Sequence, residues 1–276
     1  MSTDFVLSSI SDRVCTLTLN NPERHNAWSH EMEHRYFELL DTAAADDEVR
    51  TIVLTGSGTS FCPGLDTESL AHVANEGELV LAGRRSQHYA LTVPKPMIAA
   101  VNGACAGIGL VQALACDVRF AARGARFSTA YARLGLAAEY GLSWILPRMI
   151  GVENALDLLL SSRPFDADEA LALGVVSRVC QPDDVLADAQ SYATELAQHC
   201  SPLAMAAIRR QVWGDLSKSW FEANADWLEL MRRFNARESN PDFAEGVAAL
   251  REKRVPNFGP LPADLELPEP LAFPLQ

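Results

Sequence analysis

The chain has little positive charge for its size. Lysine and arginine account for 23 of its 276 residues, against 36 acidic residues, which gives a formal net charge of -13 at pH 7. Its lysines are Lys95, Lys218 and Lys253. Nucleic acids and anionic membranes are bound through a concentrated basic surface. The composition therefore argues against both partners, and a negatively charged substrate would need a local group of arginines.

Cysteine is sparse and follows no pattern. No C-x-x-C occurs, and the six residues stand singly at Cys15, Cys62, Cys105, Cys116, Cys180 and Cys200. Isolated cysteines are typical of small buried side chains in a reducing compartment, which argues against a zinc site or a disulfide framework. The first ten residues, MSTDFVLSSI, also lack the basic start and long apolar core of a signal peptide. We therefore expect a cytoplasmic protein.

Long uncharged runs are also rare. Residues 97–116 form a stretch of twenty residues without a charge, which is long enough to cross a bilayer. Asn102, Gln112 and three glycines interrupt this stretch, and two prolines precede it. We expect a strand, a glycine turn and a helix here rather than a membrane span.

Several common catalytic motifs are missing. The sequence has no P-loop, no G-x-G-x-x-G and no G-x-S-x-G, so a nucleotide cradle and a nucleophile elbow lack support. Cys62 in SFCPGLD is expected to fill a turn rather than act as a nucleophile, because nothing nearby lowers its pKa. Residues 30–34 match H-E-x-x-H, but the apolar stripe of that segment puts His30 and His34 on a solvated face, and no metal site is expected. The stripe consists of Trp28, Met32, Tyr36, Leu39 and Ala43.

What the sequence does contain is an alternation of strand and helix patterns, which predicts an α/β fold with buried strands. The expected strands are RVCTLTLNNP, TIVLTGSG, PMIAAVNG, DVRFAA, ARFSTA and VVSRVC. Helical patterns follow the first and third, and residues 78–92 and 152–162 are helical too. Asp166 with Glu169 resembles a capping box that opens a further short helix. We divide the chain into a core over residues 1–200 and a helical C-terminal region over 201–276.

That C-terminal region continues a long helical pattern. Apolar residues recur at helical spacing from Asp184 to about Lys253. The tail beyond Val255 holds six prolines in 21 residues and is expected to be extended.

Two segments carry the candidate chemistry. The glycine cluster NGACAGIG (102–109) precedes a helical pattern, so its backbone N–H groups could hold an oxyanion, although close packing of a strand against a helix would explain the glycines equally well. LGLAAEYGLSWILP contains a single charged residue, Glu139. Burial would raise the pKa of that carboxyl toward the range of a general acid or base. The alternative is a surface turn at Tyr140-Gly141.

Together these pieces resemble the enoyl-CoA hydratase/isomerase (crotonase) superfamily over nearly the whole chain, to about residue 255. The matching segments include LTLNNPERHNAWS, IVLTGSGTSFCPGLD and PKPMIAAVNGACAGIGLVQALACDVRFAARGARFS. The resemblance implies a crotonase-like β-β-α spiral core, a helical C-terminal region used for trimer contacts, and acyl-CoA substrates. Coenzyme A would be part of the substrate rather than a cofactor, and the assembly would be a homotrimer or a hexamer.

The resemblance also implies roles for particular residues. Two backbone N–H groups polarise the thioester carbonyl in this family, and the second of them corresponds to Ile108, after Gly107. The loop FCPGLD supplies the first donor, Asp66 closes it, and the backbone near Leu65 lies against the CoA adenine. Arg24 falls where a basic residue often meets a CoA phosphate, although a solvated arginine is nearly as good an interpretation.

Three departures from the family pattern matter more than the matches. Val111 and Tyr131 stand where typical hydratases carry glutamates, and Pro63 stands where the first oxyanion donor usually lies, although proline has no N–H. We therefore expect Gly64 to supply the replacement donor. Glu139, eight residues after Tyr131, is placed where isomerase-type and some other members carry a catalytic acid.

These observations give one hypothesis and two alternatives. The hypothesis is an enoyl-CoA hydratase, with isomerase as the second activity, in which Glu139 moves a proton, Tyr131 positions water and Val111 lines an apolar acyl slot. The alternatives are a hydrolase of a non-CoA β-diketone, for which the altered FCPG loop is less of a handicap, and a non-catalytic CoA-binding protein.

Overall fold

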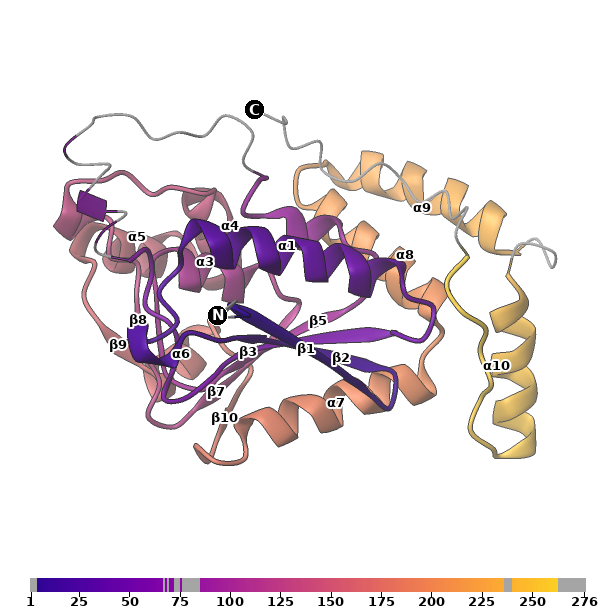
Figure 1. Cartoon of the computed structure of the whole chain (residues 1–276). Coiled ribbons are helices and arrows are strands. Elements are labelled where there is room, and N and C mark those ends of the chain that lie inside the picture. Colours follow the sequence, from indigo (N-terminus) through magenta and orange to yellow (C-terminus); the bar gives the residue numbers. More distant parts are fainter. Residues whose placement is uncertain are drawn as a thin grey trace.

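The computed structural model describes residues 4–66, 68, 70, 71, 75, 85–235 and 240–262. A six-stranded sheet runs through its centre in the order β1-β2-β3-β5-β7-β10 (Figure 1). β1 pairs antiparallel with β2, and each of the other neighbouring pairs is parallel. The strands are β1 (Val6–Ser11), β2 (Val14–Leu19), β3 (Thr51–Gly56), β5 (Met97–Val101), β7 (Val118–Ala122) and β10 (Arg178–Cys180). The predicted α/β class is confirmed.

A second, four-stranded sheet is built from the segments that follow the central strands. Its order is β4-β6-β8-β9, where β4 follows β3, β6 follows β5 and β8 follows β7 along the chain. The strands are β4 (Ser60–Cys62), β6 (Ala104–Ala106), β8 (Arg126–Ser128) and β9 (Phe165–Asp166). Each repeat thus contributes one strand to each sheet, which is the expected β-β-α spiral. β6 was not predicted, because its three residues lie inside the glycine cluster.

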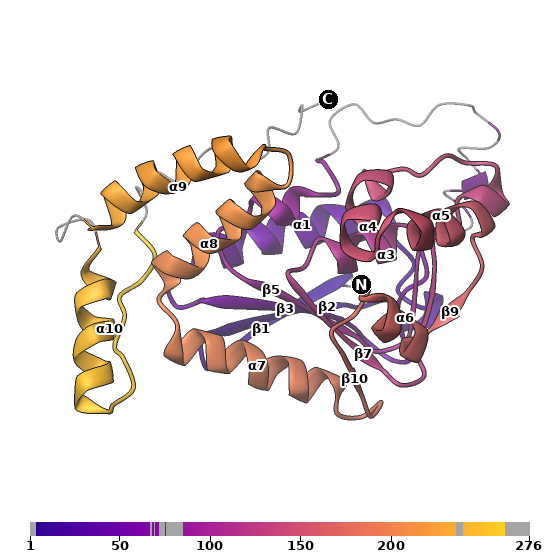
Figure 2. The same ribbon diagram turned by 180° about the vertical axis from the view of Figure 1, so that it is seen from behind.

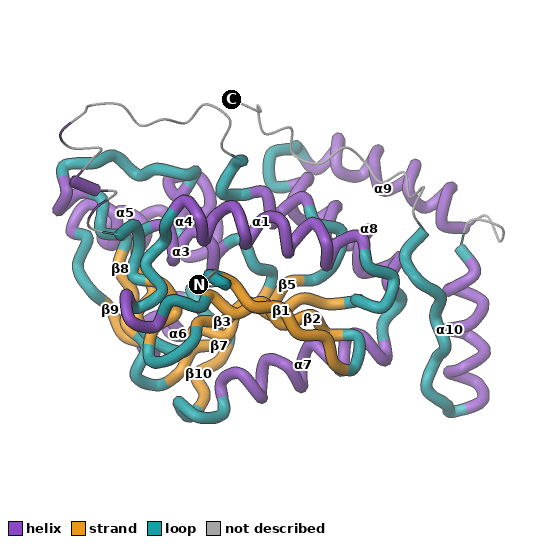
Figure 3. The backbone as a smooth tube through the Cα atoms, in the orientation of Figure 1, coloured by secondary structure: helices purple, strands orange, loops and turns teal. Residues whose placement is uncertain are grey.

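Helices cover both faces of the central sheet (Figure 3). α1 (His30–Ala45) lies on one side and α7 (Val185–His199) on the other, as Figures 1 and 2 both show. Ala189 and Ala193 of α7 pack against Val53 and Ile98 of the central strands. The apolar stripe predicted for α1, from Trp28 to Ala43, is buried along its whole length. Because both faces are covered, the central strands are apolar without alternation.

Further helices carry the chain past the two sheets. These are α3 (Ile108–Leu114), α4 (Leu142–Ile150), α5 (Val152–Ser161) and α6 (Ala167–Leu173), with 3-10 helices at Pro22–Arg24, Tyr89–Thr92 and Ala132–Leu134. The Asp166 carboxylate accepts the Glu169 N–H at 2.9 Å and caps α6 as predicted, whereas the Glu169 carboxylate accepts from Arg163 instead. Of the helix predicted over 78–92, residues 78–84 lie outside the described residues, residues 85–88 are not helical, and Tyr89–Thr92 form a 3-10 helix.

The C-terminal helices extend away from the sheets at one end (Figure 2). They are α8 (Pro202–Asp215), α9 (Trp220–Asn235) and α10 (Pro241–Glu252). Arg209 of α8 holds this region to the core, since it pairs with Asp117 at 2.7 Å and donates to the carbonyl of Ala90 at 2.8 Å. The division at residue 200 stays a prediction. Within the described ranges no helix is long and apolar enough to cross a membrane.

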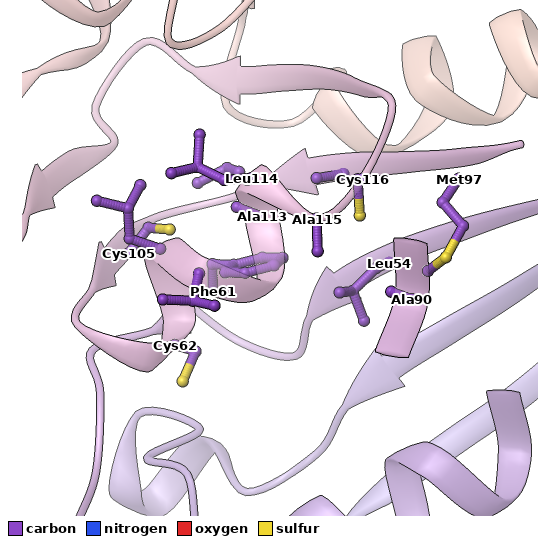
Figure 4. Packing of buried hydrophobic residues seen from close by; sticks show 14 of the residues in the cluster. Leu54, Phe61, Cys62, Ala90, Met97, Cys105, Ala113, Leu114, Ala115 and Cys116 are labelled. Atoms are coloured by element: carbon purple, nitrogen blue, oxygen red, sulfur yellow. The ribbon is translucent and has the colours of Figure 1, made fainter. Parts of the chain in front are cut away.

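The glycines next to α3 are required for packing. A Cβ on Gly109 would lie 2.1 Å from the carbonyl oxygen of Cys62, and one on Gly103 would lie 1.9 Å from that of Thr59. Both distances are shorter than any tolerated contact with a backbone atom. Glycine at 109 therefore lets the start of α3 approach β4, and glycine at 103 lets the turn before β6 approach the residue before β4. Figure 4 shows the side chains of Phe61, Cys62 and Cys105 beside this helix. Close packing therefore accounts for two of the clustered glycines.

We expect Gly109→Ala to destabilise the protein strongly. The added methyl group overlaps the Cys62 carbonyl and forces α3 away from β4, at a cost of about 3 kcal/mol or more of unfolding free energy. Urea unfolding followed by tryptophan fluorescence measures the change. Gly124→Ala is the matched control, since its Cβ would meet no atom within 4 Å, and it is expected to change stability by less than about 1 kcal/mol. Equal effects of the two substitutions would contradict the packing explanation.

Candidate active site

The first predicted loop leaves β4 and turns sharply at Gly64. The φ angle of Gly64 is +117°, a conformation that a side chain would make strained. Its carbonyl accepts the Trp28 N–H at 2.7 Å, and Leu65 forms a bridge with Trp28. Asp66 is buried and its carboxylate accepts the Glu68 N–H at 3.0 Å, directly after the loop. Pro63 lies exposed at the tip.

The second predicted loop joins β6 to α3. Gly107 has a φ of +51°, and its N–H donates to the Ser128 carbonyl at 3.1 Å. A Cβ on Gly107 would lie 3.8 Å from the Cα of Gly64, so the two loops face each other. Within the described part of the chain, the amides of Gly64 and Ile108 donate to no backbone carbonyl, and the Gly64 backbone lies against the Cys62 sulfur. Two such N–H groups close together can hold a negatively charged oxygen.

Cys62 and Val111 line the interior behind these loops. Burial raises the pKa of the Cys62 thiol to about 12, so the thiolate is scarce at neutral pH. The prediction that Cys62 is not a nucleophile agrees with this environment. Val111 is buried in α3, one turn after Ile108, within the same apolar cluster as Tyr131 and Leu142. The start of α3 thus presents backbone amides in front of an apolar interior.

Glu139 lies in a tight turn between β8 and α4. The two residues after it, Tyr140 and Gly141, have φ angles of +49° and +66°. Such a conformation is unusual for tyrosine and persists only where the surrounding structure holds it. The Glu139 side chain is partly buried, and this burial raises its carboxyl pKa above the usual range. The segment is therefore a turn, as the surface alternative required, but its carboxylate is partly withdrawn from water.

Tyr131 is electrostatically coupled to Glu139. The side chain is 5% exposed, and its hydroxyl has no hydrogen-bond partner among the described residues. Burial raises the pKa of Tyr131, and the charges of Glu139 and Tyr140 raise it further. A neutral phenol beside a carboxylate can donate a hydrogen bond to water or to substrate.

His88 is a neighbour of this turn that the sequence analysis missed. A Cβ on Gly141 would lie 3.1 Å from Cε1 of His88, so the imidazole packs against the turn. Burial lowers the pKa of His88 to about 4, and the ring is therefore neutral at physiological pH. No local motif marks His88, because it reaches the turn from a segment more than fifty residues away.

Arg24 and the two histidines of the H-E-x-x-H pattern lie outside this group. Arg24 is exposed and pairs with Glu68 through contacts of 3.2 and 3.3 Å, so an incoming phosphate would compete with that carboxylate. His30 and His34 are exposed on α1, as predicted. Across the residues that are described, no group of three or more His, Cys, Asp or Glu side chains could hold a metal ion.

The arrangement of spiral core, facing glycine loops and buried apolar interior agrees with a known family. A model of enoyl-CoA hydratase/isomerase matches residues 9–260. The chain belongs to the enoyl-CoA hydratase/isomerase family. The matched residues include all of both sheets except the start of β1, and they extend beyond the end of α10.

Individual members of the family confirm the match. The chain is 34% identical over 264 residues to 1,2-epoxyphenylacetyl-CoA isomerase of Escherichia coli, which covers 92% of this chain and 98% of that protein. The crystal structure of an enoyl-CoA hydratase from Polaromonas is 32% identical, with a TM-score of 0.84, and covers 92% of this chain and 99% of its own. The enoyl-CoA hydratase EchA12_1 of Mycobacterium marinum is 44% identical over 78% of this chain and all of its own, with a TM-score of 0.68.

Proposed function

We propose that this family member hydrates an enoyl-CoA thioester, with migration of the acyl double bond as its second activity. The observation that carries the proposal is the meeting of two loops whose Gly64 and Ile108 amides donate to no backbone carbonyl of the described residues. Two preorganised N–H groups stabilise the negative charge that develops on a thioester oxygen. Coenzyme A belongs to the substrate, and the proposal includes neither a separate cofactor nor a metal.

Gly64 takes the place of the donor lost at Pro63. Proline cannot donate, and the next amide along the loop belongs to Gly64. The positive φ of Gly64 and the hydrogen bond from the Trp28 backbone N–H to the Gly64 carbonyl fix the orientation of the peptide groups on either side of Gly64. This fixed geometry supports Gly64 as a preorganised donor, because a donor that must reorient during the reaction stabilises the transition state less.

In the proposed hydration, Glu139 acts first as a base and then as an acid. Its carboxylate takes a proton from water as the water oxygen adds to C3, and the electron pair of the double bond moves onto the thioester oxygen as an enolate. The enolate is held by the Gly64 and Ile108 amides, and Glu139 then returns the proton to C2. The raised pKa of Glu139 suits both steps. Tyr131 would position the water.

Isomerisation needs the same groups and one proton. Glu139 would remove a proton from C2 of a 3-enoyl-CoA and return it to C4, while the two amides hold the intermediate dienolate. A single carboxylate can perform both transfers, which favours this reaction as the second candidate. The similarity to an isomerase that acts on 1,2-epoxyphenylacetyl-CoA supports it as well.

The remaining predicted residues are assigned to substrate binding. Val111 would line the acyl slot behind Ile108, while Pro63, Leu65 and Asp66 would form the wall beside the adenine. Arg24 would meet a CoA phosphate once its exposed pair with Glu68 opens, which costs little for a solvated ion pair.

An assay with two substrates tests the proposal. Hydration of crotonyl-CoA removes its conjugated absorbance, and isomerisation of a 3-enoyl-CoA creates such absorbance. We expect the purified protein to turn over at least one of the two. If CoA binds and neither thioester reacts, the protein is a non-catalytic CoA-binding member. Turnover of a cyclic β-diketone without affinity for CoA would instead establish a C–C hydrolase.

The proposal extends to assembly and location. Large apolar side chains are exposed on the C-terminal helices, among them Trp220 at 71%, Phe221 at 79% and Leu250 at 80%. Exposed apolar surface of this extent is typical of interfaces. It supports a homotrimer or a hexamer formed through α8, α9 and α10. The acidic composition and isolated cysteines support a cytoplasmic location.

A further inference from the structure

A buried carboxylate outside the proposed catalytic group connects the segments that form the site. Glu33 of α1 is 3% exposed. Its Oε2 accepts the indole N–H of Trp28 at 3.1 Å and the side-chain amide of Gln87 at 2.8 Å. Removing a charged side chain from water is costly unless donors compensate it. The two donors to this one oxygen therefore compensate the cost of burying the Glu33 carboxylate.

One arm of this arrangement leads to the Gly64 loop. The backbone N–H of Trp28 donates to the Gly64 carbonyl at 2.7 Å, and the Trp28 backbone carbonyl accepts the Asp66 N–H at 3.4 Å. The Trp28 side chain is completely buried. Glu33 fixes the indole of Trp28, and the backbone of Trp28 holds the loop on both sides of Leu65. A displacement of Trp28 therefore displaces the Gly64 peptide.

The other arm leads to α3 and to the Glu139 turn. Gln112 is completely buried in α3, and its amide donates to Oε1 of Gln87 at 2.9 Å and to the Gln87 carbonyl at 3.2 Å. Ile108 opens the same helix one turn earlier. The residue after Gln87 is His88, whose ring packs against Gly141. The network thus reaches both proposed amide donors and the turn that carries Glu139.

An apolar side chain at position 33 could not accept these two hydrogen bonds. It would leave the Trp28 and Gln87 donors buried without an acceptor, and a buried donor without a partner is destabilising. Hydrogen bonds to a carboxylate are shorter and stronger than those between neutral groups. Buried polar networks are directional where apolar contacts are not, so they fix one arrangement of the segments they join.

We propose that Glu33 is a positioning residue that sets the distance and orientation between the Gly64 and Ile108 amides. The proposal rests on the proposed function, since it concerns the oxyanion site of that reaction. Glu33 touches no reacting atom and acts through Trp28 on one side and through Gln87 and Gln112 on the other. Misplacement of a catalytic group by about 1 Å is enough to cost about 100-fold in rate.

Glu33→Gln tests the proposal, because glutamine keeps the shape and one acceptor but weakens both hydrogen bonds. We expect kcat to fall by at least about 10-fold with KM changed by less than about 3-fold, since positioning affects the transition state more than binding. A chromophoric unsaturated acyl-CoA gives a second readout: polarisation of its carbonyl moves its absorbance to longer wavelength, and this shift should shrink in the variant. Glu38→Gln, an exposed position on the same helix, is the matched control and should leave both readouts unchanged.

The outcomes distinguish a failure of the proposed function from a failure of the positioning role alone. A wild-type protein that binds the chromophoric thioester with no shift would overturn both. A wild-type shift that Glu33→Gln retains in full, with unchanged kcat, would overturn the positioning role alone. If the glutamine variant does not fold, Trp28→Phe removes the indole N–H and keeps an aromatic ring, and the same loss of shift and kcat is expected of it. A Trp28→Phe protein with wild-type shift and kcat would contradict the proposal.

Discussion

Glu139→Gln should lower kcat by about 100- to 10,000-fold while KM stays nearly constant, because positioned proton transfer contributes rate enhancement of that size. Glutamine preserves the shape of the side chain and cannot accept or return a proton. We expect the segment around it, with positive φ angles at Tyr140 and Gly141, to keep its conformation, because the exchange preserves the side-chain shape. Steady-state kinetics with whichever enoyl-CoA the wild-type protein turns over measures the effect. A variant with full activity would remove Glu139 from the mechanism.

The pH dependence gives the same residue a second test. Burial raises the pKa of Glu139, and the reaction begins with its deprotonated form. The value of kcat/KM should therefore fall as the pH decreases through this raised pKa, at a higher pH than an ordinary glutamate would produce. The acid limb should disappear in the residual activity of Glu139→Gln. Glu153→Gln, an exposed position in α5, is the matched control and should keep the wild-type profile.

Ile108→Pro should lower kcat by about 100- to 1000-fold, the usual cost of losing one oxyanion donor. Proline deletes the N–H that is proposed to hold the thioester oxygen. Ile108 is the first residue of α3, where the helix makes no use of its own N–H and proline is well tolerated. The substitution therefore removes a donor at a position where the helix itself is compatible with proline. Circular dichroism and the thermal midpoint check that the fold is kept.

Ile108→Val is the matched control for the lost amide. It shortens the same side chain by one methylene and keeps the N–H, so we expect kcat within about 3-fold of wild type, since the transition-state donor is unchanged. The small loss of packing should appear as about 1 kcal/mol of unfolding free energy. If Ile108→Pro folds and retains the kcat of Ile108→Val, the Ile108 amide does not hold the reacting oxygen.

Much of the central sheet could be predicted from the sequence, because its strands are short apolar runs closed by turn residues. Val14–Leu19, Thr51–Gly56 and Met97–Val101 lie within the segments that were predicted. The helix over His30–Ala45 was predicted from its apolar stripe, and that stripe is buried. These elements depend on local pattern, and local pattern is what a sequence displays.

Elements that depend on distant partners were missed. β6 has three residues and exists because β4 and β8 pair with it on either side. α4 begins after the left-handed Gly141 and contains Pro147, two features that argue against a helix when they are read locally. The packing of the turn against His88, from a separate segment, is visible only in the folded chain.

The candidate site divides in the same way. The isolated carboxylate in an apolar run left burial and a surface turn open for Glu139, and the structure shows a partly buried side chain in a turn. The glycine cluster left backbone donors and close packing open, and packing accounts for Gly103 and Gly109. The buried position of Glu33 was not predicted, because the H-E-x-x-H pattern around it points to the two histidines, which are exposed. Its partners Trp28 and Gln87 are aligned only by the fold.

The central claim is that a thioester carbonyl lies between the Gly64 and Ile108 amides. Difference infrared spectroscopy of an unreactive acyl-CoA, carrying carbon-13 at its thioester carbonyl, measures this most directly. We predict that the carbonyl stretch of the bound ligand moves to lower frequency than that of the free ligand, and that Ile108→Pro loses most of this shift. A ligand that binds with an unshifted carbonyl in the wild-type protein would contradict the claim.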